Sequence, residues 1–316
     1  MVPPRLMLLA LAASLLALPA CGGDTAASAG GGGRPDVVTA FYPLQFVAGR
    51  VGDDQVTVTN LTEPGAEPHD LELTPKQVGQ IADADLVVYI EGFQPAVDEA
   101  VEQNSPGRTL EVSTVAPFEA TGAEEALESE EHGAGAPEPA AGEEHGDPHI
   151  WLDPTKLANV ATAVGDQLAE IDPGNADSYR ANAKGLADDL AALDGDYRAG
   201  LANCPQQAFV TSHAAFGYLA KRYALEQIPI AGVSPEAEPS PQRIAEVQKL
   251  VRARGITTVF FETLVSPKLA KTIARDTGAQ AAVLDPIEGI EADGSGDYLS
   301  VMRANLEALR KALSCT

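Results

Sequence analysis

The sequence of 316 residues has little positive charge: 21 Lys and Arg stand against 46 Asp and Glu, which gives a formal net charge of -25 at pH 7. Such a surface repels the phosphates of nucleic acids, so a nucleic-acid partner is not expected, and it attracts cations. Three catalytic motifs are also absent from the sequence, namely an H-E-x-x-H helix, a G-x-S-x-G turn and a Gly-rich phosphate loop. These absences argue against an enzyme.

Long hydrophobic runs are scarce, and the apolar run at residues 6–18 is too short to cross a bilayer. With Arg5 before it, this run predicts a signal peptide over residues 1–20. The end of the run, Leu18-Pro19-Ala20-Cys21, resembles a bacterial lipobox, so Cys21 is the expected lipidated residue; the alternative is a plain signal peptide with an incidental cysteine. Residues 21–35 are then a lipid-anchored flexible tether. The protein is expected outside the cytoplasm, anchored to the cell membrane by Cys21, or periplasmic.

Cysteine is rare, with three residues in the whole chain. If Cys21 carries lipid, Cys204 and Cys315 remain as a pair in an oxidising compartment, where a disulfide is the expected state. Such a bond would tie the C-terminal helix to the start of the second half of the chain. The alternative is two unpaired thiols, because geometry decides whether two cysteines can bridge.

Short apolar runs rich in Val and Ile alternate with longer amphipathic stretches in both halves of the chain. Continuous apolar strands interleaved with helices indicate parallel sheets covered on both faces. We therefore predict an α/β protein with two Rossmann-like lobes, each a parallel sheet with flanking helices, over residues 36–172 and 203–316. The expected strands are 37–41, 56–61 and 86–90 in the first lobe and 208–211, 227–230, 257–261 and 281–284 in the second.

Between the lobes, the sequence predicts a long helix. Asp172-Pro173-Gly174 breaks the helical pattern, and apolar residues then recur at three- and four-residue spacing from Tyr179 to Leu201. Residues 173–202 are thus expected to form a rigid backbone helix that joins the two lobes.

The first lobe contains an acidic segment at residues 119–147 with ten carboxylates, two histidines and no Lys or Arg. Its low hydrophobicity and high charge predict a disordered loop. The segment is interpreted either as a solvated acidic loop with weak attraction for cations or as a metal-gathering element.

Histidine is also scarce, and three of the five histidines, His69, His149 and His213, stand where predicted strands give way to loops. Ligands of open parallel sheets bind at the carboxyl ends of strands, so donors from both lobes should meet in a cleft between them. Asp285 follows the expected strand 281–284 and adds a carboxylate. Three imidazoles and one carboxylate form a four-coordinate set that suits Zn²⁺. Glu262 or water are the alternative fourth donors.

At these residues the chain resembles the zinc- and manganese-binding solute-binding lipoproteins of bacterial metal ABC transporters. The resemblance covers residues 37–313 and rests on four blocks taken together: Pro68-His69-Asp70 with Leu73-Thr74-Pro75; Asp147-Pro148-His149-Ile150-Trp151-Leu152-Asp153-Pro154; Thr211-Ser212-His213-Ala214-Ala215-Phe216-Gly217-Tyr218; and Phe260-Phe261-Glu262-Thr263 with Ser266-Pro267-Lys268.

The resemblance implies two α/β lobes joined by a long helix, with a buried metal between them held by His69, His149, His213 and Asp285. Glu262 is interpreted as a supporting residue that holds a ring N–H of a ligand. Manganese-type relatives carry a carboxylate in the place of His213, so the third imidazole favours zinc. Some zinc-type relatives have a Glu directly before the first His, where this chain has Pro68.

The function expected from these residues and from the resemblance is high-affinity binding of zinc outside the cytoplasm and delivery to a membrane ABC permease with its ATPase, by a protein that is a monomer and not an enzyme. One alternative is a manganese- or iron-binding protein of the same family. Another is an extracytoplasmic zinc hydrolase, with Glu262 as the general base. A third, a surface adhesin, has no independent support in the sequence.

Overall fold

The computed structural model describes residues 33–105, 107–121, 146–290 and 296–316. The predicted signal peptide, Cys21 and all but the last three residues of the predicted tether lie outside these ranges, and so does most of the acidic segment. Arg34–Thr316 form one compact unit. None of the helices in the described ranges has the length and apolarity that crossing a membrane would require.

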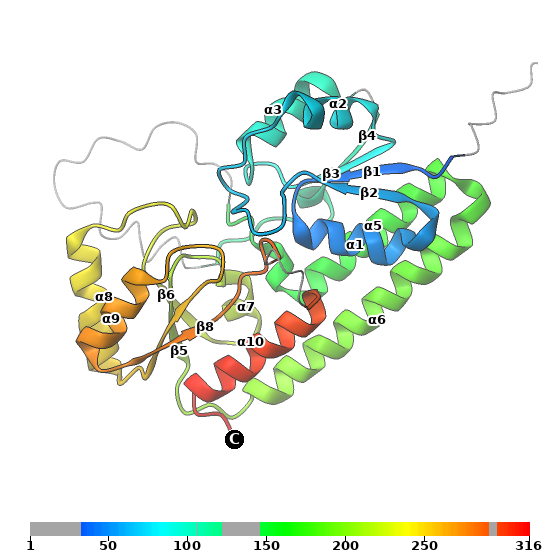
Figure 1. Ribbon diagram of the computed structural model, residues 1–316. Helices are drawn as coiled ribbons and strands as arrows, with labels where there is room; N and C mark the ends of the chain where they lie inside the picture. The colour runs from blue at the N-terminus through cyan, green and yellow to red at the C-terminus, as the bar shows by residue number, and fades with distance from the viewer. Residues whose placement is uncertain (1–32, 106, 122–145, 291–295) are drawn as a thin grey trace, which may run out of the picture. The chain divides into compact units, whose positions relative to one another are not determined.

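The first sheet has the strand order β2-β1-β3-β4, and all of its strands are parallel. Figure 1 shows α2 and α3 on one side of this sheet and α1 and α5 on the other. The elements are β1 (Asp36–Thr39), α1 (Tyr42–Gly52), η1 (Asp53–Gln55), β2 (Thr57–Asn60), α2 (Pro75–Asp83), β3 (Leu86–Tyr89), α3 (Pro95–Asn104), β4 (Arg108–Glu111) and η2 (Val112–Thr114).

The second sheet repeats this plan with the order β6-β5-β7-β8, again fully parallel. Its elements are β5 (Ala208–Thr211), α7 (Gly217–Arg222), β6 (Glu226–Pro229), α8 (Pro241–Arg254), β7 (Thr258–Phe261), α9 (Lys268–Thr277), β8 (Gln280–Val283) and α10 (Tyr298–Ala312). The predicted fold class is confirmed: the protein is α/β with two parallel sheets flanked by helices.

All seven predicted strands exist, with boundaries shifted by one or two residues at most, but β4 was not predicted. Its sequence, Arg-Thr-Leu-Glu, has one buried apolar residue, Leu110, and its first two residues are exposed. A strand at the edge of a sheet can be this polar because it is paired on one side only, so it lacks the continuous apolar run by which the other strands were found.

The connection between the sheets consists of η3 (Ile150–Leu152), α5 (Pro154–Ile171), the short turn η4 (Pro173–Asn175) and α6 (Ala176–Leu201). At 1.5 Å per residue, the 26 residues of α6 extend over about 39 Å. Its buried face consists of the residues whose spacing predicted the helix, namely Tyr179, Ala183, Leu186, Leu190, Leu193, Tyr197 and Leu201. The predicted long helix is present, although its first turn is the separate 3-10 turn η4.

Helices α5 and α6 pack closely against each other along their length. A Cβ on Gly165 of α5 would lie 2.8 Å from the Cβ of Ala183 on α6, so only glycine allows this approach. Helix α6 also contacts α1 of the first lobe and α10 of the second. One hydrophobic core runs from the first sheet through α5 and α6 to α10, and includes Phe209 and Phe260 of the second sheet. The lobes therefore share buried apolar surface.

The predicted pairing of Cys204 with Cys315 is present as a disulfide. The two cysteines are 111 residues apart in the sequence, and the bond attaches the end of the chain, just after α10, to the segment between α6 and β5. The connector and the last helix are thereby fixed to each other at one end of the second lobe.

A charged network fixes α6 to α7. The carboxylate of Asp194 accepts hydrogen bonds from Nε of Arg222 at 2.7 Å, from Nε of Arg198 at 2.9 Å and from the hydroxyl of Tyr223 at 3.1 Å. Burial alone would raise the pKa of Asp194, but these donors lower it to about 2. Since the pKa in the unfolded chain is near 3.8, the ionised carboxylate stabilises the fold above pH 4.

We predict that Asp194→Asn lowers the free energy of unfolding of the metal-free protein by about 1–2 kcal/mol at pH 7. The loss should shrink as the pH falls from 4 toward 2, because the wild-type carboxylate then becomes protonated in both states. Urea unfolding between pH 7 and pH 3 measures this difference. Asp188→Asn on the same helix is the matched control, since Asp188 is 67% exposed and its pair with Lys184 should contribute less than about 0.5 kcal/mol. An equal effect of both substitutions would contradict the prediction.

Candidate metal centre

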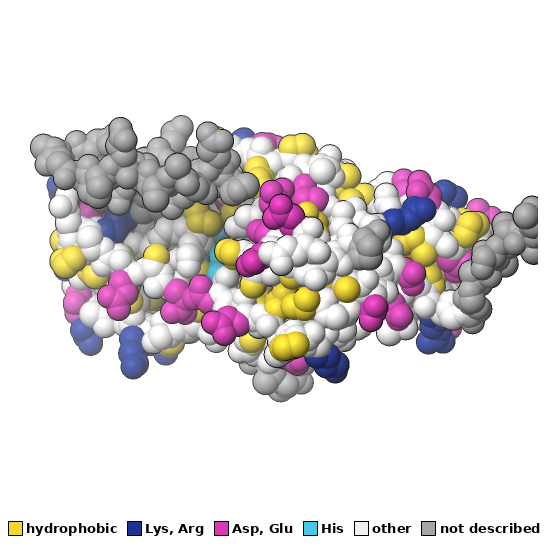
Figure 2. Space-filling view, turned by 90° about the horizontal axis from the view of Figure 1, so that it is seen from above, with side chains coloured by type: hydrophobic (Ala, Val, Ile, Leu, Met, Phe, Trp, Pro, Cys, Tyr) yellow, Lys and Arg dark blue, Asp and Glu magenta, His cyan; other side chains and the backbone are white. Residues whose placement is uncertain are grey.

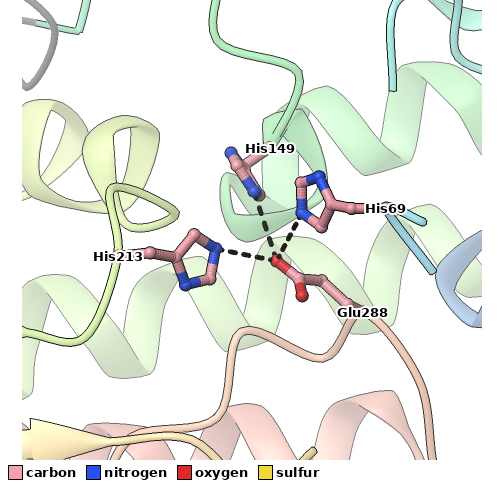
Figure 3. A group of neighbouring side chains, drawn as sticks. All are labelled: His69, His149, His213 and Glu288. Atoms are coloured by element: carbon pink, nitrogen blue, oxygen red, sulfur yellow. Dashed lines mark hydrogen bonds and ion pairs between the residues drawn. The ribbon is translucent and has the colours of Figure 1, made fainter. Parts of the chain in front are cut away.

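Four side chains from four separate segments converge on one point (Figure 3): His69, His149, His213 and Glu288. Each offers one ligand atom, and these four atoms all lie within 4.8 Å of one another. His149 and His213 have no exposed surface, Glu288 is 2% exposed, and the His69 side chain is 9% exposed. The three predicted imidazoles are thus brought together in a buried cluster.

Oε1 of Glu288 lies at the centre of the contacts, 3.5 Å from Nε2 of His69, 3.2 Å from Nε2 of His149 and 3.1 Å from Nε2 of His213. A tetrahedral zinc ion with ligand bonds of about 2.0–2.1 Å has ligand atoms about 3.3 Å apart. Nε2 of His69 and Nε2 of His149 are buried and make no hydrogen bond. Two ring nitrogens that make no hydrogen bond and face a carboxylate oxygen at these distances fit a bound cation.

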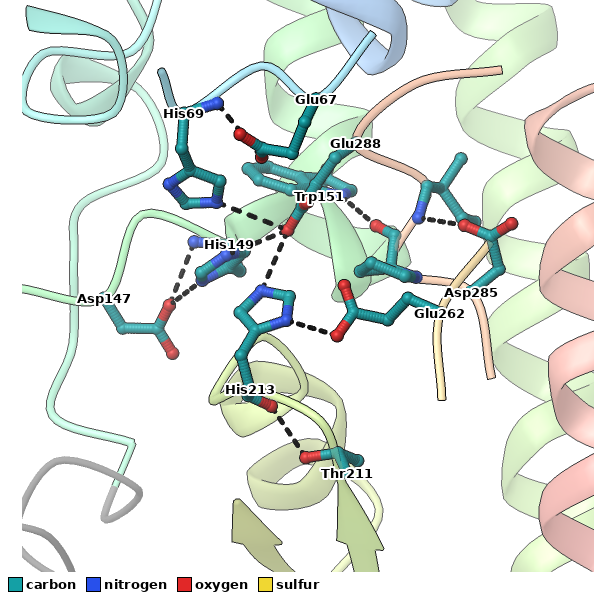
Figure 4. Close-up of polar contacts among 12 residues, drawn as sticks. Glu67, His69, Asp147, His149, Trp151, Thr211, His213, Glu262, Asp285 and Glu288 are labelled. Atoms are coloured by element: carbon teal, nitrogen blue, oxygen red, sulfur yellow. Dashed lines mark hydrogen bonds and ion pairs between the residues drawn. The ribbon is translucent and has the colours of Figure 1, made fainter. Parts of the chain in front are cut away.

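His149 is held by Asp147, two residues before it (Figure 4). Oδ1 of Asp147 accepts hydrogen bonds from Nδ1 of the ring at 2.8 Å and from the backbone N–H of His149 at 3.0 Å. A carboxylate on one ring nitrogen fixes the tautomer and leaves the other nitrogen free to bind a metal. Oδ2 of Asp147 accepts from Thr121, and a Cβ on Gly217 would lie within 2.7 Å of both side chains, so glycine is required there.

His213 follows β5 and is held in the same manner by Glu262, which follows β7. Nδ1 of His213 lies 2.7 Å from Oε1 of Glu262, in the position predicted for the residue that supports a ring N–H. The carbonyl of His213 accepts hydrogen bonds from Oγ1 of Thr211 at 2.7 Å and from Nε2 of Gln227 at 2.9 Å. His213 is therefore fixed through both its ring and its backbone carbonyl.

His69 has a different environment. Its backbone N–H donates to the carboxylate of Glu67 at 3.1 Å, the carbonyl of Pro68 accepts from Gln94, and the Phe93 ring packs 4.5 Å from the His69 ring. Within the described residues, no carboxylate holds its Nδ1. Figure 2 shows histidine surface recessed on one face, and among the described histidines only His69 has surface to expose. The cluster therefore meets solvent at His69.

The structure places Glu288, and not Asp285, beside the imidazoles. The carboxylate of Asp285 accepts hydrogen bonds from the backbone N–H of Ile287 at 2.8 Å and from the hydroxyl of Thr263 at 3.0 Å. It thus fixes the loop after β8, which carries Glu288. Ile287 has φ 58°, an uncommon conformation for a β-branched residue, and this turn brings Glu288 back to the cluster.

The expectation that all donors stand at strand ends is correct for His213 but wrong for His149. The described strand that precedes His149, β4, ends at Glu111, and His149 stands directly before η3. Glu288 lies five residues after the end of β8, so it is not the residue next to the strand. The signal available in the sequence was a second acidic residue in the same loop.

The charges in the cluster depend on one another. Burial alone would lower the pKa of His213 and His149, but the adjacent carboxylates raise both, His213 well above its usual value through Glu262 and Glu288. Burial alone would raise the pKa of Glu288, but the imidazoles lower it well below its usual value. In the metal-free protein the carboxylate and the imidazoles thus each favour the charged form of the other.

Comparisons with known proteins agree with this geometry. The family described as "Zinc-uptake complex component A periplasmic" (ZnuA) matches residues 37–312. The zinc-binding protein AdcA of Streptococcus pyogenes is 40% identical over 291 residues, which are 88% of this chain and 56% of that protein. The high-affinity zinc uptake system protein ZnuA of Bacillus subtilis is 35% identical over 315 residues, 97% of each chain. This chain thus spans just over half the length of the first curated relatives it matches.

The fold agrees with solved structures as well. The crystal structure of the Zn(II)-bound ZnuA-like domain of AdcA from Streptococcus pneumoniae matches with a TM-score of 0.71 and 32% identity, covering 89% of this chain and 99% of that one. The resemblance stated from the sequence is therefore confirmed.

We predict that Glu288→Gln weakens zinc binding at least about 100-fold, because it removes the one carboxylate that faces the Nε2 atoms of the three imidazoles, which are themselves neutral when they bind zinc. Asp285→Asn, which keeps an acceptor for the N–H of Ile287, should weaken it less than about 10-fold. Competition with a zinc chelator of known affinity measures both values. Equal losses in the two variants, or a larger loss for Asp285→Asn, would return Asp285 to the position of the fourth ligand.

Proposed function

The chain belongs to the zinc-uptake complex component A family, and on this premise we propose that it binds zinc with high affinity outside the cytoplasm and delivers it to the permease of an ABC transporter. The observation that carries this proposal is the buried set of three imidazoles and one carboxylate, in which Oε1 of Glu288 lies 3.1–3.5 Å from the three ring nitrogens and all four ligand atoms lie within 4.8 Å of one another. The transported cargo is Zn²⁺, and His69, His149, His213 and Glu288 are its proposed ligands.

The donor types support zinc over the manganese and iron alternatives. Imidazole nitrogens suit zinc, whereas manganese sites lean on oxygen donors. Three nitrogens and one oxygen within 4.8 Å of one another form a four-donor set, whereas an octahedral ion takes a larger number of ligands.

The zinc hydrolase alternative is disfavoured by the positions of the two glutamates. A catalytic zinc needs three protein ligands with an open position for water, and a general base close to that water. Here Glu288 fills the fourth position, and Glu262 bonds Nδ1 of His213 on the far side of the ring from the cluster. Carriage of the ion without chemistry fits this arrangement better.

The proposed location and partners follow from the sequence and the family. We assign residues 1–20 to a signal peptide, Cys21 to lipid attachment and residues 21–35 to a tether that holds a monomer at the cell membrane. The functional divisions are then residues 36–172, 173–202 and 203–316, with two ligands from each lobe. The partners are the permease with its ATPase.

Release of zinc to the permease should begin at His69. Nδ1 of His149 and of His213 is bonded to a buried carboxylate, whereas the ring of His69 reaches solvent and is oriented through backbone bonds and the Phe93 ring. A docked permease can reach this imidazole first. Loss of one ligand would weaken the hold on the ion before the others move.

We predict that the protein purified without added metal carries one zinc per chain and that His213→Ala carries none, because the substitution removes a ligand and leaves Glu262 and Glu288 buried without their partner. Elemental analysis gives the stoichiometry, and the rise in melting temperature on adding zinc reports binding independently. Ser212→Ala, next to the ligand, is the matched control and should keep full zinc. A His213→Ala variant that retains stoichiometric zinc would refute the proposed ligand set.

We also predict an order among the imidazoles: His69→Ala should retain zinc at least about 10-fold more tightly than His213→Ala. Solvent can supply a water to the exposed position, whereas removal of His213 leaves two buried carboxylates unpaired. Chelator competition on the two variants gives the ratio. If His69→Ala binds zinc as weakly as His213→Ala or more weakly, His69 is not the labile ligand.

A further inference from the structure

Trp151, the one tryptophan of the chain, contacts segments of both lobes beside the His69, His149, His213 and Glu288 group. It lies two residues after His149, in η3, and has no exposed surface. Its indole N–H donates to the carbonyl of Pro286 at 2.7 Å, and its own carbonyl accepts from the hydroxyl of Tyr298 at the start of α10. Pro286 lies two residues before Glu288, so the indole bonds the loop that carries this proposed ligand (Figure 4).

The same indole packs against the ligands of the first lobe. Its ring lies 5.1 Å from the His149 ring and 5.3 Å from the Phe93 ring, and Phe93 in turn packs against the ring of His69. Trp151 therefore touches, directly or through one ring, two imidazoles of the first lobe and the Glu288 loop of the second.

The loop after β8 is otherwise held mainly from its own lobe. Asn305 of α10 bonds both the N–H and the carbonyl of Asp285, and the Asp285 carboxylate bonds Ile287 and Thr263. From the first lobe, the N–H of Gly65 donates to the carbonyl of Ile290, two residues beyond Glu288. Apart from the contacts of His69 and His149 with the Glu288 carboxylate itself, the bond from Trp151 is the one side-chain hydrogen bond from the first lobe to this loop among the described contacts.

On the basis of the proposed zinc binding, we propose that Trp151 is a positioning residue: its indole N–H fixes Pro286 so that Oε1 of Glu288 stays at ligand distance from the three imidazoles. The bond spans the two halves of the ligand set, and its loss would let the carboxylate withdraw with its loop. Zinc would then bind more weakly and with altered geometry, even where the fold is kept.

The test removes the indole N–H of Trp151 while keeping the volume of its side chain. Because the chain has one tryptophan, growth on benzothienyl-alanine, in which sulfur stands in place of the indole N–H, changes this position alone. Trp151→Phe is the genetic counterpart. Tyr197→Phe is the matched control, because Tyr197 donates an equally short, buried hydrogen bond, 2.7 Å to the carbonyl of Met302, between α6 and α10 and away from the ligands.

Zinc affinity is measured by chelator competition, and coordination geometry by the visible absorption of Co²⁺ bound in place of zinc, which is intense for four-coordinate cobalt and weak for higher coordination. The analogue and Trp151→Phe should weaken zinc binding about 10-fold or more and reduce the cobalt absorption. Tyr197→Phe should lower the melting temperature of the metal-free protein but leave zinc affinity within about 2-fold of wild type and the cobalt spectrum unchanged.

Wild-type affinity and an unchanged cobalt spectrum in the analogue-containing protein would overturn the proposal, and so would equal losses in Tyr197→Phe. If Trp151→Phe does not fold, the isosteric analogue still decides the matter. Failure of the proposed function has a different signature: the unmodified protein itself would then bind neither zinc nor cobalt.

Discussion

A buried carboxylate surrounded by three imidazoles is the constraint on which the rest of the structure depends. Glu288 remains ionised with almost no exposure, which is costly unless positive charge lies beside it. Both ring nitrogens of His213 lie beside carboxylates, Nδ1 2.7 Å from Glu262 and Nε2 3.1 Å from Glu288, and these carboxylates raise the pKa of the imidazole in the metal-free protein. Zinc can replace this arrangement, because a dication compensates Glu288 while the imidazoles become neutral ligands. The site is thus prepared for a cation in either state.

The continuous core limits how such an ion can leave. Helix α6 buries one face along its length, and the apolar cluster extends from the first sheet to α10. Opening the lobes as a hinge would expose this surface, at about 25 cal/mol for each Å² of apolar area. Local displacement of the loops that carry His69 and Glu288 leaves the core closed. Release of zinc by movement of these loops is therefore less costly than release by separation of the lobes.

Much of this could be predicted from the sequence, and the exceptions have physical causes. The apolar runs gave seven strands because buried parallel strands are continuously hydrophobic, whereas the polar edge strand β4 has no such pattern. The three histidines stand out because the residue is rare in this chain and each lies in a distinctive turn. Glu288 was not among the predicted fourth donors, Asp285, Glu262 or water, because the chain reverses at Ile287 in a left-handed conformation that propensity does not favour.

Asp285, the predicted ligand, and Glu288, which lies beside the imidazoles, have different roles: Asp285 fixes the loop, and Glu288 brings a carboxylate to the imidazoles. The sequence alone does not show which residue has which role. The carboxylate of Asp285 accepts a hydrogen bond from the backbone N–H of Ile287 in its own loop, so it points to the backbone and not to the imidazoles. Burial also raises the pKa of Asp285. Glu288 can place its carboxylate beside the imidazoles because Asp285, Asn305 and Trp151 fix the backbone of its loop. Asp285 and Glu288 are three positions apart, and nothing in the sequence distinguishes their roles. They differ in the folded chain because a single turn directs one carboxylate to the backbone and the other to the imidazoles.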